Sequence, residues 1–113
     1  MAEPDWKDVL AATDLDEHGH LVDAGAWTPE LARAMAAADG ITLTPLHWWV
    51  IEFVRDHYRR YGTPPLMRVV VSMMREQTDH ADASSRTLYR LFPAGPIREA
   101  CRYGGLPRPD SCL

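Results

Sequence analysis

The two cysteines of this 113-residue chain, Cys101 and Cys112, are the residues whose type and spacing could do chemistry. Both lie in the last thirteen residues, and Cys112 is next to last. The chain advances twelve residues from Cys101 to Leu113. An extended chain covers about 3.3–3.6 Å per residue, so this segment could reach on the order of 40 Å. A thiol at the tip of such an arm could enter the active site of another protein.

Glycine and proline dominate the arm. Gly104 and Gly105 are predicted to end the preceding helix and to act as a hinge, because glycine tolerates backbone conformations that other residues avoid. Pro107 and Pro109 fix φ and stiffen the distal part. A stiff rod loses less conformational entropy on entering a binding site than a flexible tail does. The composition therefore predicts a hinged, semi-rigid arm.

The same arm, folded back, would bring Cys112 to Cys101 and close a short loop. In the chain-entropy model, closing a loop of this length costs on the order of 3 kcal/mol, which a disulfide of balanced redox potential can release or accept. The alternative is a permanent stapling disulfide, but such bridges are uncommon in the cytoplasm. A bridge so near the terminus would also constrain little of the core. The spacing of Cys101 and Cys112 therefore favours a disulfide that forms and breaks reversibly.

The histidines suggest two further kinds of site. There is no CxxC pair, and His18 and His20 are far in sequence from the cysteines, so no metal site is predicted. A nucleophilic pair of Cys101 with His47 or His57 is an alternative, although no oxyanion-hole motif accompanies it. His47 and His57 are interpreted as structural, hydrogen-bonded histidines.

Charge and hydropathy limit the classes of function. The formal charge is -4 and the isoelectric point about 5.6, which argues against a protein that mainly binds nucleic acid through its phosphates. The chain starts without a basic segment followed by an apolar run, and it contains no stretch of eighteen apolar residues. We therefore expect a cytoplasmic protein with an ordinary core, and nucleic acid is not an expected partner.

Three Thr-Pro pairs mark predicted helix starts, because threonine caps a backbone N–H and proline suits the first helical position. They are Thr28-Pro29, Thr44-Pro45 and Thr63-Pro64. Gly40 and Gly62 mark predicted ends of the first two helices, and Ser84 is a further candidate cap. Helices are predicted near residues 29–39, 45–61, 65–77, 84–91 and 96–103.

The predicted fold is mainly α (α+β). Leucines flank a polar, glycine-containing centre over residues 15–22, which indicates a small N-terminal β-hairpin. The whole is expected to be a helical bundle with a helix-turn-helix-like pair and a flexible C-terminal arm. We predict one domain over residues 1–113, with a variable N-terminus (1–13), a globular body (14–103) and a mobile arm (104–113).

Two features of the helix pair 45–61 and 65–77 leave alternatives open. Trp49 falls outside the apolar stripe of the first helix, so it either covers a neighbouring element, which we favour, or contacts a partner. Arg68 and Arg75 on the second helix could read a DNA groove. The apolar residues of that helix need burial, however, so core packing is favoured; they are Met67, Val70, Val71 and Met74.

The ordered motifs of the chain resemble the DsrC/TusE/DsvC sulfur-carrier family. The C-terminal match comprises Leu91-Phe-Pro-Ala-Gly-Pro96, Ala100-Cys101, Gly105-Leu-Pro-Arg-Pro109 and Cys112. The upstream match comprises Asp16-Glu-His-Gly-His-Leu21, Trp27, Leu43-Thr44, His47-Trp48, Val54-Arg55, Tyr58, Pro65 and Arg68-Val69. Together they cover about residues 14–113, and Cys101 at this spacing resembles DsrC proper, since TusE-type members generally lack it.

The resemblance implies a protein that carries sulfane sulfur covalently on its penultimate cysteine, here Cys112, without a bound cofactor. It would be no stand-alone enzyme but a cosubstrate of dissimilatory sulfite reductase, a sirohaem enzyme. Cys101 would join Cys112 in a disulfide or trisulfide. The implied partners also include a heterodisulfide-reductase-like membrane complex and sulfurtransferases of the DsrEFH/TusBCD type.

Two alternatives to this function are kept. One is a TusE-like sulfur relay for tRNA thiolation, and the other is a redox-responsive regulator that binds DNA or protein. The chain departs from the family at residues 84–89 and 98–99, which bears on the choice of partner. Arg68 and Arg86 match basic family positions and are predicted to support the retracted arm, although both also suit a solvated surface.

Overall fold

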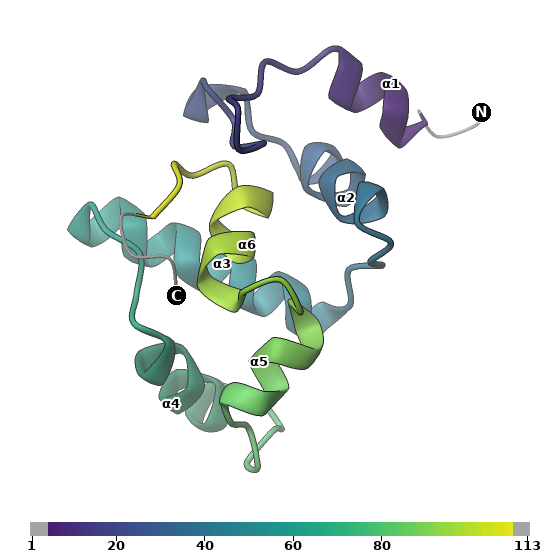
Figure 1. The fold of residues 1–113 in the computed structure, drawn as a ribbon. Helices are drawn as coiled ribbons and strands as arrows, with labels where there is room; N and C mark the ends of the chain where they lie inside the picture. Colours follow the sequence, from purple (N-terminus) through teal and green to yellow (C-terminus); the bar gives the residue numbers. More distant parts are fainter. Residues whose placement is uncertain (1–4, 110–113) are drawn as a thin grey trace.

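Helices make up most of residues 5–109, the part of the chain that the computed structural model describes (Figure 1). In chain order they are α1 (Trp6–Ala11), the short 3-10 helix η1 (Ala24–Ala26), α2 (Pro29–Ala38), α3 (Pro45–Tyr61), α4 (Met67–Gln77), α5 (Ser85–Leu91) and α6 (Pro96–Tyr103). The prediction of a mainly helical protein is confirmed. Over residues 5–109, no helix is both long and apolar enough to cross a membrane.

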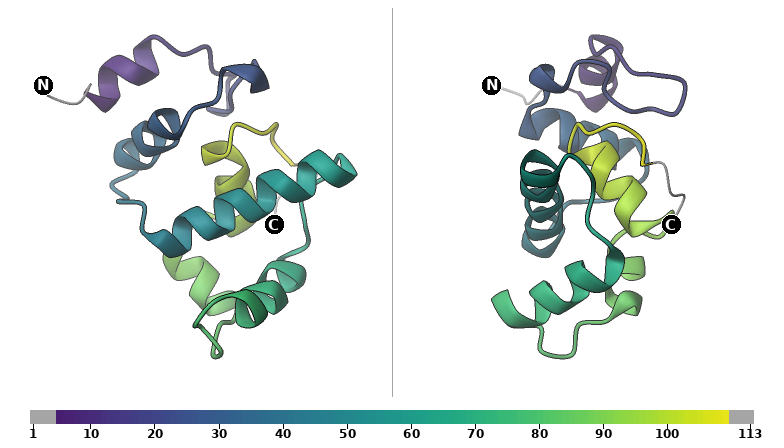
Figure 2. Two further views of the ribbon diagram at one scale, coloured as in Figure 1. Left: turned by 180° about the vertical axis from the view of Figure 1, so that it is seen from behind. Right: turned by 90° about the vertical axis from the view of Figure 1, so that its left-hand side faces the viewer.

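The helix that carries Cys101, α6, packs against three other helices. It contacts α2, α3 and α5, while α1 packs on α2 and α4 packs on α3 and α5. Figures 1 and 2 show α1 and α2 at one end of the molecule and α4 and α5 at the other, with α3 and α6 between them. The largest fully buried side chains include Met35 of α2, Ile51 of α3, Met74 of α4, Phe92 of the α5–α6 loop and Tyr103 of α6.

Two of the three predicted Thr-Pro helix starts are confirmed. The hydroxyl groups of Thr28 and Thr44 accept hydrogen bonds from the first turns of α2 and α3, and proline occupies the first turn of each helix. The prediction at Thr63 is wrong, since α4 begins only at Met67. Pro64 precedes a second proline, which disfavours its helical conformation and keeps this stretch extended.

The cap of α3 gives a first testable prediction. Thr44 and His47 form a reciprocal capping box, in which the Thr44 hydroxyl accepts from the His47 N–H and the Thr44 N–H donates to the His47 ring (3.1 Å). Replacing Thr44 by alanine should lower the free energy of unfolding by about 1–2 kcal/mol. Denaturant titration would measure this, with Thr42→Ala as the control, since exposed Thr42 lies before the cap. Equal losses in both variants would contradict the prediction.

The predicted N-terminal β-hairpin is not confirmed. Within residues 5–109, this stretch shows one isolated antiparallel bridge, between Leu15 and Leu21. The Asp16 carboxylate accepts from the N–H groups of His18 (2.8 Å) and His20 (2.9 Å), which draws the backbone into a tight turn instead of a ladder. These bonds, that of His20 most strongly, lower the pKa of Asp16.

The helix pair α3 and α4 packs into the core. The sequence favoured this arrangement over one in which the second helix reads a DNA groove. Val70, Val71 and Met74 of α4 are buried, and Arg68 is exposed. Trp49 is half-buried on α3 and stacks on Phe53 one turn later, with ring centroids 5.2 Å apart. Both rings pack against the edge of the core.

The two histidines of α3 differ in their surroundings. His47 is buried, and its Nε2–H donates to the Leu91 carbonyl at 2.8 Å, so the interpretation of a hydrogen-bonded structural histidine fits it. His57 is half-buried at the rim of the core, where its ring donates to the Thr63 carbonyl at 2.8 Å. His57 therefore helps to shape the α3–α4 turn.

Candidate functional site

Cys101 lies on α6 and is fully buried, with none of its surface exposed. Removing a thiolate from water is unfavourable, so burial raises the pKa of the Cys101 thiol to about 12 from its usual 9.0. Thiol chemistry needs the thiolate, and at neutral pH this thiol is almost entirely protonated. Cys101 is therefore inert as long as its surroundings stay packed.

Cys112, the predicted sulfur carrier, lies outside the described residues, which end at Pro109. The distance between the two cysteines and their pairing therefore stay predictions. The described residues include the point at which the arm leaves the body. Residues 104–106 are buried, and the exposed part of the segment begins at Pro107.

The two glycines end α6, as expected from the sequence. Gly105 has φ +72°, the N–H of Leu106 donates to the Cys101 carbonyl (2.9 Å), and the N–H of Gly105 donates to the Arg102 carbonyl (3.3 Å). This pattern is a Schellman motif, which reverses the chain directly after a helix. It brings the backbone of Leu106 back onto the turn that carries Cys101, and both side chains belong to the same buried core cluster.

Three side chains from three different parts of the chain bind the backbone of this turn. The indole N–H of Trp27 donates to the Tyr103 carbonyl (2.7 Å). The guanidinium of Arg55, on α3, donates to the Gly104 carbonyl (3.0 Å), and the ring of His20 donates through Nδ1 to the Leu106 carbonyl (2.9 Å). We call Trp27, Arg55 and His20 the latch. In this structure Gly104 and Gly105, the predicted hinge, thus lie in a bonded, packed turn.

Two members of the latch also pack on each other. The guanidinium carbon of Arg55 lies 3.6 Å from the centroid of the Trp27 ring, a cation–π distance. The Trp27 ring in turn covers Gly105, where an added Cβ would come within 2.5 Å of Trp27 Cδ1. Burial lowers the pKa of the Arg55 guanidinium, which nevertheless remains charged at neutral pH. Only glycine fits the backbone at position 105.

A charged cluster fixes the same end of α6 to α2. Arg102 pairs with Glu99 (2.8 Å) and with Asp39, and the Tyr103 hydroxyl donates to the Asp39 carboxylate (2.7 Å). Burial, and then the bond to Asp39, raise the pKa of Tyr103. Burial alone would lower the pKa of Arg102, but its bond to Glu99 and the nearby carboxylates outweigh this and raise it. The cluster and the latch together hold the helix end that carries Cys101.

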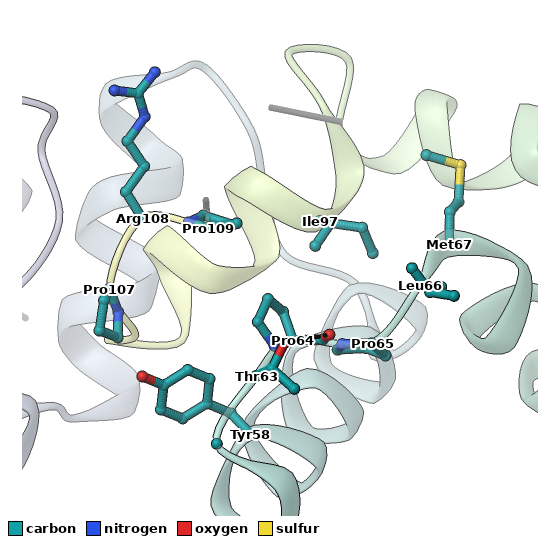
Figure 3. A pocket seen from close by; sticks show the side chains of 11 residues that line it. Tyr58, Thr63, Pro64, Pro65, Leu66, Met67, Ile97, Pro107, Arg108 and Pro109 are labelled. Carbon is teal, nitrogen blue, oxygen red and sulfur yellow. Dashed lines mark hydrogen bonds between the residues drawn. The ribbon is translucent and has the colours of Figure 1, made fainter. Parts of the chain in front are cut away.

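A pocket of about 580 Å³ adjoins the exposed part of the arm (Figure 3). The α3–α4 turn forms one side, with Pro64, Pro65 and Leu66, while Pro107 and Pro109 form another. Figure 3 shows Arg108 extending away from the pocket between these two prolines. The arm therefore leaves the body along the rim of a largely apolar hollow.

The two predicted supporting arginines lie elsewhere. Arg68 is exposed on α4 and Arg86 is exposed on α5. Within residues 5–109, no hydrogen bond or ion pair joins either of them to the arm residues Gly104, Gly105 or Pro107. Their support of a retracted arm stays a prediction. In the same range no group of three or more His, Cys, Asp or Glu side chains is placed to hold a metal ion.

The latch was not predicted from the sequence. His20, Trp27 and Arg55 each occur in the motifs that carry the family resemblance, but nothing in their spacing links them to one turn. They lie 86, 76 and 49 residues from their respective partners. The available signal was the paired glycines: a glycine required for close packing implies a bulky neighbour, here Trp27.

Comparison with known proteins agrees with this architecture. A family model described as "DsrC like protein" matches residues 10–113. A relative from Pectobacterium atrosepticum, named Sulfurtransferase TusE, is 41% identical over 98 residues, which cover 87% of this chain and 90% of the relative. The chain belongs to the DsrC-like family, and the resemblance found in the sequence is confirmed.

Two solved structures share the fold at substantial sequence identity. The oxidized gamma-subunit of dissimilatory sulfite reductase (DsrC) from Archaeoglobus fulgidus matches with a TM-score of 0.79 and 36% identity, over 89% of this chain and 92% of that one. DsrC from Allochromatium vinosum matches with a TM-score of 0.77 and 38% identity, over 89% and 90%. Relatives with these names support a role in sulfur transfer.

Proposed function

We propose that this protein is a sulfur-relay carrier of the TusE type, in which Cys112 holds sulfane sulfur as a persulfide. In loading, the Cys112 thiolate attacks the outer sulfur of a donor persulfide, and the donor leaves as a thiolate. In delivery, an acceptor thiolate attacks the outer sulfur of the Cys112 persulfide, and the Cys112 thiolate leaves. Neither step requires an external oxidant, and neither uses Cys101.

The burial of Cys101 carries this proposal. A relay needs one reactive thiol, and a fully buried second thiol with a pKa of about 12 stays out of the exchange. The sulfurtransferase name of the curated relative supports the same choice. The relay therefore fits better than the sulfite reductase cosubstrate that the sequence favoured. The proposed destination is tRNA thiolation, reached through sulfurtransferases of the TusBCD type in the cytoplasm.

The presence of Cys101 favours a second candidate function. A cosubstrate of dissimilatory sulfite reductase requires two cysteines that can join in a disulfide or trisulfide, and this chain has both. Its matched structures include a protein described as a gamma-subunit of that enzyme. In this function the carrier would also meet a heterodisulfide-reductase-like complex. Either way the protein acts as a cosubstrate for other enzymes.

Intact-mass measurement after incubation with a persulfide donor tests the carrier role. The chain should gain one sulfur atom, which a thiol reductant removes. Cys112→Ser should lose this gain almost completely, and Cys101→Ser should keep it. Sulfur uptake by the Cys112→Ser chain would refute the proposal.

A competition between partners separates the two candidate functions. The persulfide-loaded chain is offered a purified TusBCD-type sulfurtransferase and, separately, sulfite reductase subunits, and sulfur transfer from a labelled donor is followed. The relay predicts transfer with the first partner that the Cys101→Ser chain performs equally well. Productive turnover only with sulfite reductase, and only with both cysteines, would favour the second candidate.

A further inference from the structure

We propose that the latch, formed by Trp27, Arg55 and His20, is a gate that decides whether Cys101 can react with the arm. This inference rests on the proposed carrier function for its final chemical step, although the shielding itself can be tested independently. With the latch closed, Cys101 is shielded and the carried sulfur can only be passed to a partner. With the latch open, Cys101 can attack the arm.

The latch binds almost every carbonyl of the turn that follows α6. Tyr103, Gly104 and Leu106 each use their main-chain oxygen to accept from one latch side chain. All three residues are buried, so loss of a donor would leave a carbonyl unsatisfied away from water. His20 belongs to the N-terminal turn, Trp27 to the segment before α2, and Arg55 to α3. The turn after α6 is therefore held by three separate parts of the chain.

The turn held by the latch folds back onto the end of α6 and is bonded to the backbone of Cys101. The N–H of Leu106 donates to the Cys101 carbonyl, and Leu106 is itself 8% exposed within the core cluster. Lifting residues 103–106 from the body would break the three latch bonds, the two bonds of the Schellman motif and the bond from the Tyr103 hydroxyl to Asp39. Such a lift uncovers the last turn of α6 without unfolding the remaining helices. Local opening of this kind generally requires less free energy than global unfolding.

The chemical consequence of opening is a change in the fate of the carried sulfur. The Cys101 thiolate attacks the inner sulfur of the Cys112 persulfide, and hydrosulfide leaves. A disulfide between Cys101 and Cys112 forms, so the two cysteine sulfurs are oxidised while the sulfane sulfur is reduced to sulfide. The proton of the Cys101 thiol goes to solvent, and no further reactant is needed. A closed latch therefore prevents the carrier from discharging its own cargo.

The opening of the gate can be measured as alkylation of Cys101 in a Cys112→Ser background. Trp27→Phe keeps an aromatic ring but removes the N–H that binds the Tyr103 carbonyl. Loss of this bond should raise the rate of iodoacetamide modification about tenfold at pH 8. Arg55→Lys, which keeps the charge but loses the planar contact with Trp27, serves as a second variant. Circular dichroism and thermal melting check that each variant is folded.

Two controls separate a gate from general destabilisation. Trp48→Phe makes the same chemical change at a half-buried tryptophan of α3, outside the latch, and should leave the alkylation rate unchanged. Met74→Ala removes a fully buried side chain of α4 and lowers global stability away from the gate. If Met74→Ala accelerates alkylation as much as Trp27→Phe does at equal loss of stability, Cys101 is exposed by global unfolding and the proposal fails.

The final step is tested with both cysteines present. After loading with a persulfide donor, Trp27→Phe should release sulfide and form the intramolecular disulfide about tenfold faster than the unchanged chain. Equal rates of sulfide release would overturn the gate. Failure of the unchanged chain to load at Cys112 would instead overturn the carrier function, so the two failures are distinguishable.

Discussion

In a Cys112→Ser chain at pH 8, native Cys101 is expected to react with iodoacetamide at least about a thousandfold more slowly than the same thiol in denaturant. The pKa of about 12 lies about three units above the usual 9.0, and each unit lowers the thiolate fraction tenfold. Full burial also blocks the approach of the reagent. Mass spectrometry of the modified chain would follow both reactions. Comparable rates in the native and denatured chains would show that Cys101 is accessible.

The same burial predicts that stability falls at alkaline pH. The folded protein holds the Cys101 proton more tightly than the unfolded chain, so the stabilisation is fully present below pH 9 and is lost as pH rises towards 12. Between pH 8 and pH 10 the free energy of unfolding should drop by about 1.4 kcal/mol from this group. Tyr103, whose pKa is also raised, acts in the same direction. Cys101→Ala should therefore reduce the slope without abolishing it, and an unchanged slope would exclude Cys101 as a cause.

The sequence was sufficient to predict most of the helices because their ends carry local signals. Thr44 caps α3 and Gly62 closes it at φ +72°, so the predicted bounds 45–61 agree with the structure. The signals failed where two local preferences compete. At Thr63 the following proline pair outweighs the cap, and at Asp16 the side chain binds its own backbone and replaces the expected hairpin by a turn.

The candidate site was only partly predictable from the sequence. The types and spacing of the two cysteines indicated redox chemistry, but neither indicates that Cys101 is buried. In the proposed gate, this burial depends on a turn that is bound by the side chains of Trp27 and His20, which are far away in the chain. Contacts of this range are set by the packing of the whole fold, and a single sequence has no local pattern that reports them. From the sequence, Gly104 and Gly105 are therefore predicted to form a flexible hinge, whereas in the structure Gly105 allows Trp27 to pack closely against the backbone.

Gly105→Ala is expected to lower the free energy of unfolding by at least about 2–3 kcal/mol. The left-handed backbone at φ +72° costs a residue with a Cβ about 1–2 kcal/mol. The new Cβ would also lie 2.5 Å from Trp27 Cδ1 and 2.8 Å from both Trp27 Cβ and Cγ. These atoms are close to the backbone of Trp27, so a rotation of the ring alone does not relieve the clash. Either the indole or the turn must move, and the latch bonds weaken with it.

Gly40→Ala provides the matched control for this substitution. Gly40 has φ +75°, but a Cβ at this position would meet no atom within 4 Å. The control therefore suffers the backbone strain alone, and the excess loss in Gly105→Ala measures the contact with Trp27. Denaturant titration of both variants gives this difference, and alkylation of Cys101 should accelerate in Gly105→Ala but not in Gly40→Ala. Equal losses of stability with equally slow alkylation would mean that Gly105 is needed only for its backbone angle, and that Trp27 does not hold the turn over Cys101.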